Sequence, residues 1–401
     1  ADCLRSMIMA RSWMDMLAVL LLAVSFYKGS CVPVETKESW EYVDVRDGAH
    51  MFCWLYYGNS SSASYKDLPL VMWLQVSGFS LSFLCGFGNF EEIGPLDRDL
   101  KLRETSWSIP FYIFSESYGG KMAAAISLEL TKAVQAGSIK CNFAGVALGD
   151  SWISPVDSVM TWGPYLYSTS LLDDNGLDEV TNAAKAVLEA VRQGQYQKAT
   201  DLWSITENVV EQNTNGVNFY NILTQNSDEM VKTSSDQTNG FLSSLKRRHI
   251  RPLHRQSLSE LMNGPIRKKL GVIPNNVTWG GQAEAVFESM AGDFMKPVVD
   301  IVDQLLAAGV NVTIYNGQLD LIVDTMGQEL WVKQLKWDGL QYFNKMKWTA
   351  LEDPQTQRQT GAFYKTYKNF AFYWILKAGH MIPSDQGPMA LRMLKMVTQH
   401  E

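Results

Sequence analysis

The sequence predicts an α/β fold: a mostly parallel central sheet with a helical cap inserted into it. Three observations support this prediction. Apolar runs at 70–75, 111–114 and 143–148 suit strands that are buried on both faces, as in parallel sheets. A helical pattern at 121–134 separates the second run from the third, which makes a parallel βαβ unit. Helical patterns without a strong strand fill 156–264, which indicates an inserted layer of helices.

The length and composition suit one large domain with an insertion. We assign 31–155 and 265–401 to the core and 156–264 to the cap. Hydrophobic residues make up 46% of the chain, which allows a sizeable core and argues against disorder. The net charge of -7 gives no general attraction to nucleic acid, so we expect no nucleic-acid partner. The oligomeric state is not predicted.

The first segment, 1–30, is predicted to be a signal-peptide region. Arg5 and Arg11 precede an apolar stretch at 14–26, and Gly29 follows it. This stretch is too short for a comfortable membrane span, and no other segment is long and apolar enough to make one. A buried helix of the folded domain is the alternative interpretation.

Three N-x-[ST] sequons fit the secretory route that the leader indicates. They place candidate glycosylation sites at Asn59, Asn276 and Asn311. The five cysteines are widely spaced and form no C-x-x-C pair, so neither a zinc site nor a disulfide scaffold is indicated. We therefore expect no metal and no cofactor.

The remaining elements are predicted from the same kinds of pattern. Asp47 and Gly48 give a turn signal between two strands, at 40–45 and 50–57. The cap should contain helices at 177–191 and 202–210. After the cap we expect helices at 297–308 and 388–397 and strands at 310–315 and 370–376.

The stretch 110–120, PFYIFSESYGG, has the layout of a nucleophile elbow. An apolar strand runs into a tight turn centred on Ser117, and a helical pattern starts at Lys121. A sharp turn needs small neighbours, which Ser115 and Gly119 provide. The turn should lift the serine hydroxyl above the sheet and aim a helix N-terminus at the reacting group. A structural loop is the alternative, because Ser115 replaces the first glycine of G-x-S-x-G.

A serine nucleophile needs a base, and His380 is the one histidine of five that directly follows a predicted core strand. Asp320 also follows a core strand through a glycine-containing turn, so it suits the acid that orients the histidine. The order Ser117, Asp320, His380 is that of α/β-hydrolases. Asp324 is the rival acid. A turn-forming aspartate and a packed loop histidine are the structural alternatives.

Glu116 adds a clue to specificity because it directly precedes the candidate nucleophile. Either Glu91 or Glu92, in the loop after another core strand, would supply a second acid. Two carboxyl groups in one site cannot both ionise cheaply, so one stays protonated at acid pH. Such a pair can donate a hydrogen bond to the terminal carboxylate of a peptide, and it loses this ability as pH rises. A surface or salt-bridged glutamate is the alternative for Glu116.

At these residues the chain resembles the serine carboxypeptidase family. The resemblance covers nearly the whole chain after the leader and is carried by the segments YVDVRDGAHMF, LPLVMWLQ, GFGNFEEIGPL, PFYIFSESYGGKMAA, CNFAGVALGDSWISPVDSV, VTIYNGQLDLIVDTMGQE and FYWILKAGHMIPSDQG. It implies an α/β-hydrolase fold with a helical cap and the release of C-terminal residues from peptides. It also implies a secreted or lysosomal glycoprotein.

The resemblance further implies roles for individual residues. By position it implies three catalytic residues: the nucleophile Ser117, the orienting acid Asp320 and the base His380. It implies four substrate-binding residues, Glu116, Glu91, Gln75 and Tyr118. Among these, Tyr118 would supply one oxyanion-hole N–H, and Gln75 stands where the family usually has asparagine.

The sequence departs from the family pattern in two places. After Gln75 the family has a Gly-Gly-Pro-Gly loop with an oxyanion donor, whereas this chain reads VSGFSLSFLC. Losing one such donor typically costs about 10²–10³ in rate. Before the elbow the family has a further core strand and a long helix, whereas here Trp107 passes almost directly into the elbow strand. We therefore expect a strand missing from the sheet, with its neighbours left unpaired or closed up.

Three functions remain open on the sequence. The first is a serine carboxypeptidase active at acidic pH. The second is a catalytically impaired family member or variant that acts as a binding protein. The third is an esterase or acyltransferase, because the same triad supports that chemistry.

Overall fold

The computed structural model describes residues 38–46, 49–56, 69–76, 110–225, 260–278, 283–356 and 358–399. The predicted leader, the turn signal at Asp47 and Gly48, and the acids Glu91 and Glu92 lie outside these residues. None of the helices within the described residues is long and apolar enough to span a membrane.

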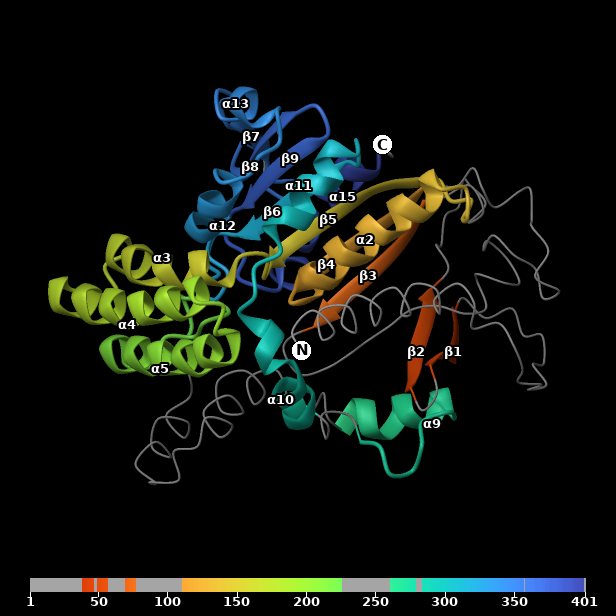
Figure 1. Cartoon of the computed structure of the whole chain (residues 1–401), viewed down its shortest axis with the longest axis horizontal. Helices are drawn as coiled ribbons and strands as arrows, with labels where there is room; N and C mark the ends of the chain where they lie inside the picture. The colour runs from red at the N-terminus through yellow and green to blue at the C-terminus, as the bar shows by residue number, and fades with distance from the viewer. Residues whose placement is uncertain are drawn as a thin grey trace.

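The strands form a large sheet and a separate hairpin (Figure 1). In the hairpin, β1 (Glu38–Arg46) pairs antiparallel with β2 (Ala49–Tyr56). The seven-stranded sheet has the order β3-β4-β5-β6-β9-β8-β7. Its strands are β3 (Leu70–Val76), β4 (Phe111–Ser117), β5 (Phe143–Ser151), β6 (Val312–Gly317), β7 (Thr349–Glu352), β8 (Thr360–Tyr367) and β9 (Phe370–Ile375). Neighbours from β3 to β9 are parallel, and β8 and β7 are added antiparallel, so the sheet is mostly parallel as predicted.

Three long helices, α3 (Pro155–Ser168), α4 (Asp174–Arg192) and α5 (Tyr196–Thr214), lie together beside the sheet (Figure 1). The other described helices are α2 (Gly119–Gln135), η6 (Met262–Ile266), α9 (Arg267–Leu270), α10 (Ala283–Phe294), α11 (Val299–Ala307), α12 (Thr325–Val332), α13 (Leu340–Phe343), α14 (Ile382–Asp385) and α15 (Gly387–Thr398).

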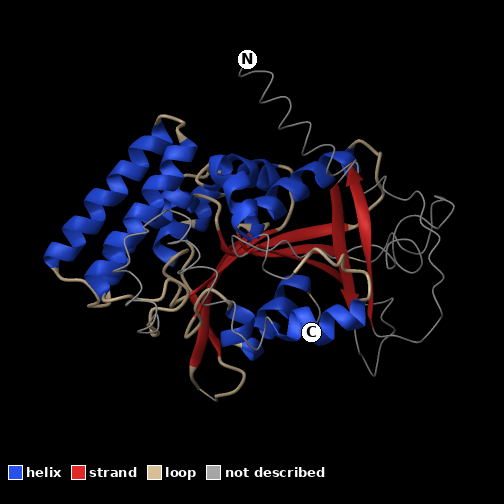
Figure 2. Ribbon diagram, turned by 90° about the horizontal axis from the view of Figure 1, so that it is seen from below, coloured by secondary structure: helices blue, strands red, loops and turns tan. Residues whose placement is uncertain are grey.

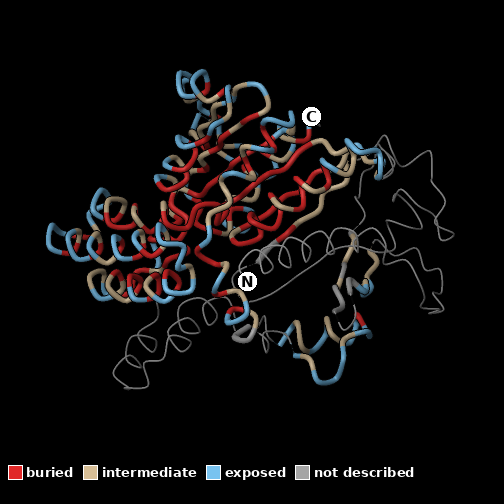
Figure 3. The backbone as a smooth tube through the Cα atoms, viewed as in Figure 1, coloured by how far each residue is buried: buried red, intermediate tan, exposed pale blue. Residues whose placement is uncertain are grey.

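The sheet is covered by helices on both faces (Figure 2). Along β4 the side chains alternate, because successive residues of a strand point to opposite faces. Ile113 packs in one cluster with residues of α2 and α11. Tyr112 and Phe114 pack in the other cluster, with Met389 of α15. The buried segments in Figure 3 accordingly follow the central strands and the inner sides of the helices.

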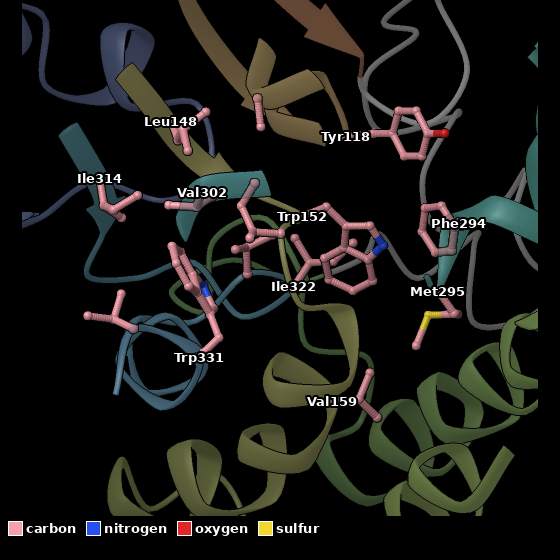
Figure 4. Close-up of a cluster of buried hydrophobic side chains, with 14 of the residues drawn as sticks. Tyr118, Leu148, Trp152, Val159, Phe294, Met295, Val302, Ile314, Ile322 and Trp331 are labelled. Carbon is pink, nitrogen blue, oxygen red and sulfur yellow. The ribbon is translucent and has the colours of Figure 1, made fainter. Parts of the chain in front are cut away.

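An aromatic cluster joins the sheet to the neighbouring helices (Figure 4). Trp152 follows β5, and its ring centroid lies 5.2 Å from that of Phe294 at the end of α10. Trp203 of α5 packs on Phe294 from another side, with the ring centroids 4.8 Å apart. Burial of such large rings supplies much of the packing energy of a core. The cluster therefore holds α5 and α10 against the edge of the sheet where β5 ends.

Most predicted elements are present, with ends shifted by a few residues. The elbow helix begins at Gly119 instead of Lys121, because the Lys121 N–H already donates to Tyr118 O in the first turn. The elements that were not predicted are the helix α3, which contains Pro164, the helices α10 and α12, the short helices η6, α9, α13 and α14, and the strands β7 and β8. Proline disfavours a helix interior, which explains why the pattern around Pro164 indicates no helix.

The prediction for 70–75 was right about the strand and wrong about its burial. Within the described residues β3 lies at the edge of the sheet, and 70–73 are only partly buried. Leu74 alone among 70–74 is fully buried. A run this apolar is typical of a central strand, so its position at an edge agrees with the absence of a neighbouring strand that the sequence comparison with the family indicated.

Candidate active site

Ser117 ends β4 in the left-handed backbone conformation, with a φ of 62°. This conformation costs a residue other than glycine about 1–3 kcal/mol, so the surrounding structure must hold it. Trp152 N donates to Ser117 O at 2.9 Å and ties the turn to the end of β5. A Cβ at Gly120 would lie 2.2 Å from Ser151 Oγ, so α2 can approach β5 this closely only with glycine there. The local geometry is that of a nucleophile elbow.

The loops that carry Asp320 and His380 follow the neighbouring parallel strands β6 and β9. The carboxyl ends of β4, β5, β6 and β9 therefore meet at one edge of the sheet, where open α/β sheets bind their ligands. The two loops touch backbone to backbone. A Cβ at Gly317 would lie 2.1 Å from Gly379 O, so glycine is required at this contact.

The structure brings Asp320 and His380 together. His380 Nδ1 lies 2.7 Å from Asp320 Oδ2, and both side chains are buried. Val323 N donates to Asp320 Oδ1 at 3.3 Å. Burial raises the pKa of Asp320 well above its usual value, and the hydrogen bond from Val323 N opposes that shift. The contact leaves Nε2 as the ring nitrogen that can take up a proton at the sheet edge.

Asp324, the rival acid, has a different structural role. It is the N-cap of α12, where its Oδ1 accepts a hydrogen bond from Gly327 N at 3.0 Å. Thr161 Oγ1 donates to its other oxygen at 2.8 Å. Burial raises the pKa of Asp324 to about 7. Its carboxyl group thus joins α12 to α3, and His380 pairs with Asp320 instead.

His380 Nε2 is buried and has no hydrogen-bond partner within the described part of the chain. The hydrogen bond between Ser117 and His380 is therefore not formed in this conformation. Catalytic hydrogen bonds are often long without substrate and tighten in the complex. Within the described residues, no other group forms a hydrogen bond with His380 Nε2, the atom that would accept the serine proton.

The structure describes three of the four predicted substrate-binding residues. Glu116 is buried directly before Ser117, and Gln75 lies opposite it in the pairing of β3 with β4. Glu91 lies outside the described residues. No described residue accepts a hydrogen bond from Tyr118 N, so this N–H is available as a donor at the N-terminus of α2. The Tyr118 hydroxyl donates to Asp293 Oδ2 at 2.7 Å.

Of the three glycosylation candidates, Asn276 and Asn311 are exposed, and Asn59 lies outside the described residues. Asn311 precedes β6, and its Nδ2 donates to Ala144 O at 2.8 Å.

Two residues of the site were missed by sequence reasoning. Asp150, at the end of β5, lies beside Asp320 and His380. Its position after a glycine at a strand end is the same signal that singled out Asp320, so it could have been found. Tyr220 lies in the loop after α5: its carbonyl accepts from His380 N at 2.8 Å, and its ring packs against the imidazole. Nothing in the sequence indicates this contact, because it joins segments far apart in the chain.

Comparison with known proteins places the chain in a family. Residues 100–400 match the family model described as serine carboxypeptidase. The chain belongs to the serine carboxypeptidase family. It is 53% identical to the retinoid-inducible serine carboxypeptidase of Mus musculus over 456 aligned positions, which include 99% of each chain. It is 37% identical to the serine carboxypeptidase-like 51 protein of Arabidopsis thaliana, with 96% of this chain and 98% of the other covered.

The alignment with the mouse serine carboxypeptidase is longer than this chain. It has 456 positions and includes nearly all of both proteins, whereas the chain has 401 residues. The relative therefore carries residues with no counterpart here. This agrees with the segment that the sequence lacks relative to the family pattern.

The fold is shared with a solved carboxypeptidase structure. The crystal structure of a prohormone-processing carboxypeptidase from Saccharomyces cerevisiae matches with a TM-score of 0.67. The match covers 90% of this chain and 91% of that chain at 15% sequence identity. The chain has the α/β-hydrolase fold of this family.

Proposed function

We propose that this chain is a serine carboxypeptidase that releases C-terminal residues from peptides at acidic pH through Ser117, Asp320 and His380. The observation that carries the proposal is the buried 2.7 Å contact between His380 Nδ1 and Asp320 Oδ2. It lies at the same sheet edge as Ser117, which has the backbone conformation of a nucleophile elbow. Family membership supplies the reaction class.

The proposed residues account for the reaction by proton transfers through His380. Ser117 Oγ attacks the carbonyl carbon of the last peptide bond while its proton passes to His380 Nε2. The Tyr118 N–H donates to the oxyanion that forms on the carbonyl oxygen. As the C–N bond breaks, the leaving amino group takes the proton from Nε2, and the shortened peptide remains as an ester of Ser117. Water then attacks this ester, passes a proton through Nε2 back to Ser117, and releases the new C-terminus.

Specificity for a free C-terminus is proposed to come from acids beside the nucleophile. Glu116 is buried, and a second acid, Glu91, would share a proton with it at acid pH. The protonated pair donates to the carboxylate of the substrate. When the pair loses its proton at higher pH, it repels the carboxylate instead, so binding should weaken as pH rises.

Labelling with a fluorophosphonate tests the nucleophile directly. We expect labelling of the native chain and of Ser168→Ala, an exposed serine that serves as a matched control, but none of Ser117→Ala. Turnover of a blocked dipeptide, measured from about pH 4 to about pH 7, should fall by on the order of 10⁶-fold in Ser117→Ala. A folded, monodisperse chain that does not label would contradict the proposal.

Two specific observations favour a second candidate, a catalytically impaired member that acts as a binding protein. The chain lacks residues that its relative has, and His380 Nε2 has no partner among the described residues. Stable folding without labelling, but with binding of a blocked dipeptide, would support this second function. Labelling with turnover of esters and none of peptides would instead support an esterase or acyltransferase.

We also propose that the chain is a secreted or lysosomal glycoprotein in which 156–264 forms a cap on the core. Asn276 and Asn311 are exposed, as an acceptor asparagine must be in the folded glycoprotein. Expression in a secreting cell, followed by glycosidase treatment, should give a shift in electrophoretic mobility. Material that remains inside the cell without sugar would contradict this part.

A further inference from the structure

Asp150 is a buried acid at the centre of the site with no assigned role. It is the last residue but one of β5, the strand between β4, which ends in Ser117, and β6, which precedes Asp320, and it is 1% exposed. Its φ of 38° is unusual for a residue other than glycine, so the surrounding structure holds its backbone in place. Its Oδ1 accepts a hydrogen bond from Gly317 N at 2.8 Å. This bond ties Asp150 to the start of the loop that carries Asp320.

The side chain of Asp150 lies close to another carboxyl group, that of Asp320. Atoms of Asp150, Asp320 and His380 lie within 4.8 Å of one another, and all three side chains are buried. The carboxyl groups of Asp150 and Asp320 are within hydrogen-bonding reach of each other. Asp150 Oδ2 nevertheless has no donor among the described residues. Two carboxylates have no proton to share, so this contact is favourable only when one of them is protonated.

We propose that Asp150 is a positioning residue of the triad: its protonated carboxyl group donates from Oδ2 to Asp320 and holds that carboxylate against His380. The inference rests on the proposed function, since it assigns a role to a partner of the proposed triad. Asp150 touches neither substrate nor nucleophile in this account, and it acts through Asp320.

The surroundings place the proton on Asp150 and the charge on Asp320. Burial raises the pKa of Asp150 well above its usual value, and the negative charge of Asp320 raises it further, while the charge of His380 and the hydrogen bond from Gly317 N oppose the shift. Asp320 is buried too, but it accepts from Val323 N and contacts His380 Nδ1, and both contacts favour a carboxylate. The other titratable groups that act on this pair are Glu116, Asp324, Tyr165, Tyr220 and Tyr315. His380 is the one group among these that can carry a positive charge. It can therefore offset one negative charge in the pair of Asp150 and Asp320, but not two.

A protonated Asp150 has a consequence for catalysis. When His380 takes the serine proton, the imidazolium faces a single carboxylate, as in other triads. If Asp150 were ionised, the imidazolium would face two negative charges, which would stabilise it before the reaction begins. The histidine would then be a poor base at acid pH, because it would already carry its proton.

Substitution of Asp150 by asparagine or by leucine distinguishes a protonated Asp150 from an ionised one. Asp150→Asn keeps a donor for Asp320 and an acceptor for Gly317 N, whereas Asp150→Leu has neither at similar volume. Asp157→Asn is the matched control for the change of charge, because Asp157 lies on α3 and bonds to Ser154. The readout is the rate of fluorophosphonate labelling at Ser117 as a function of pH, with folding checked by thermal melting.

The proposal predicts that Asp150→Asn labels within about threefold of the native rate and keeps the same acid limb of the pH profile, as Asp157→Asn does. Asp150→Leu should label about 10²-fold more slowly, the effect expected when a reacting group is misplaced by about 1 Å. If Asp150 is ionised, Asp150→Asn removes a charge beside His380 and moves the acid limb at least about one unit lower. That shift, or a folded Asp150→Leu with the native rate, would overturn the proposal.

An infrared measurement does not depend on activity. The native chain at about pH 5 should show a carbonyl band of a protonated buried carboxylic acid that is missing in Asp150→Asn and kept in Asp157→Asn. Failure to label with this band present would count against the proposed function alone. If the band is absent from the infrared difference spectrum of the native chain minus Asp150→Asn, the inference about Asp150 is overturned, whatever the activity.

Discussion

Asp320 and Asp324 show how surroundings decide the role of a residue. Both are buried aspartates in one loop, and both follow the same strand. Asp320 contacts His380, whereas Asp324 caps α12 and accepts from Thr161. The cap has a consequence for stability. Since the pKa of Asp324 rises from 3.8 to about 7 on folding, the native state holds a proton there that the unfolded chain releases.

We predict that Asp324→Asn reduces the dependence of stability on pH. Between about pH 4 and about pH 7 the native protein binds this proton more tightly than the unfolded chain, so its free energy of unfolding falls as pH rises. The contribution is about 1.4 kcal/mol per pH unit. Asparagine also caps helices but does not titrate, so the variant should lack this contribution. Urea unfolding at several pH values measures the slope.

Labelling at Ser117 is the control for this variant. Its rate should stay within a few-fold of the native rate, because Asp324 does not contact His380. An unchanged slope of stability against pH would show that Asp324 is ionised in the folded protein.

At the level of elements, α2 and α10 are joined beneath the elbow by an ion pair. Lys121 of α2 is 3% exposed, and its Nζ lies 2.9 Å from Asp293 Oδ2 on α10. Tyr118 OH donates to the same oxygen. Burial lowers the pKa of Lys121 to about 8, while the charge of Asp293 opposes that shift. The pair connects the residue after Ser117 to the aromatic cluster around Phe294 (Figure 4).

We predict that Asp293→Asn destabilises the protein by about 3–5 kcal/mol at pH 5, because it leaves the Lys121 ammonium buried without a counter-charge. Lys121→Met should cost less, since the apolar chain fills the space and the more exposed Asp293 can be hydrated. The double variant should recover part of the loss. Urea unfolding of the four proteins gives the coupling energy.

The elbow provides a second readout of this ion pair. Asp293→Asn should label more slowly at Ser117 than Lys121→Met does when both are folded, because it frees the Tyr118 hydroxyl as well. Additive effects in the double variant would show that the two side chains do not interact in solution.

At the level of the whole molecule, the described sheet ends at β3. The β1–β2 hairpin forms its own sheet, and β3 pairs only with β4 among the described strands. Leu70 N donates to Pro110 O at 3.0 Å, so alternate residues from Leu70 onward point their N–H groups at β4. Val71 and Trp73 then point theirs away from it. Within the described residues, β3 is thus the last strand of the sheet, and an apolar strand in such a position can pair with another chain.

We predict that proline is tolerated at Val71 and not at Met72. Proline at Met72 removes a hydrogen bond to β4 and leaves a buried carbonyl unpaired, which costs about 1–3 kcal/mol. Proline at Val71 removes an N–H that faces outward, as in natural edge strands. The measurement is the free energy of unfolding of each proline variant, compared with that of the alanine variant at the same position. The alanine variant corrects for the packing that is lost with the native side chain.

The association of the chain should respond in the same way. Val71→Pro should reduce concentration-dependent association measured by light scattering, because it removes an N–H on the side of β3 that faces away from β4. A destabilisation by Val71→Pro as large as that by Met72→Pro would mean that β3 has a partner on its outer side.

Local patterns in the sequence were enough to predict most strands and the elbow. The apolar run before Ser117, the small residues around it and the helical spacing after it all act within one short segment. The order of Ser117, Asp320 and His380 along the chain, with each at a strand end, was likewise sufficient to name the candidate triad. The weak pattern of α3, interrupted by Pro164, was not enough to predict that helix.

By itself, then, the sequence determined the family, the fold class and the strand ends that carry the chemistry, because these depend on local patterns and chain order. The tertiary structure alone decided that Asp320 and not Asp324 pairs with His380, that Tyr220 supports the imidazole, and that Asp150 joins the pair. It also decided that the apolar β3 is the last strand of the sheet among the described residues. These features depend on which strands are neighbours in the sheet, and contacts between residues far apart in the chain leave no periodic signal in the sequence.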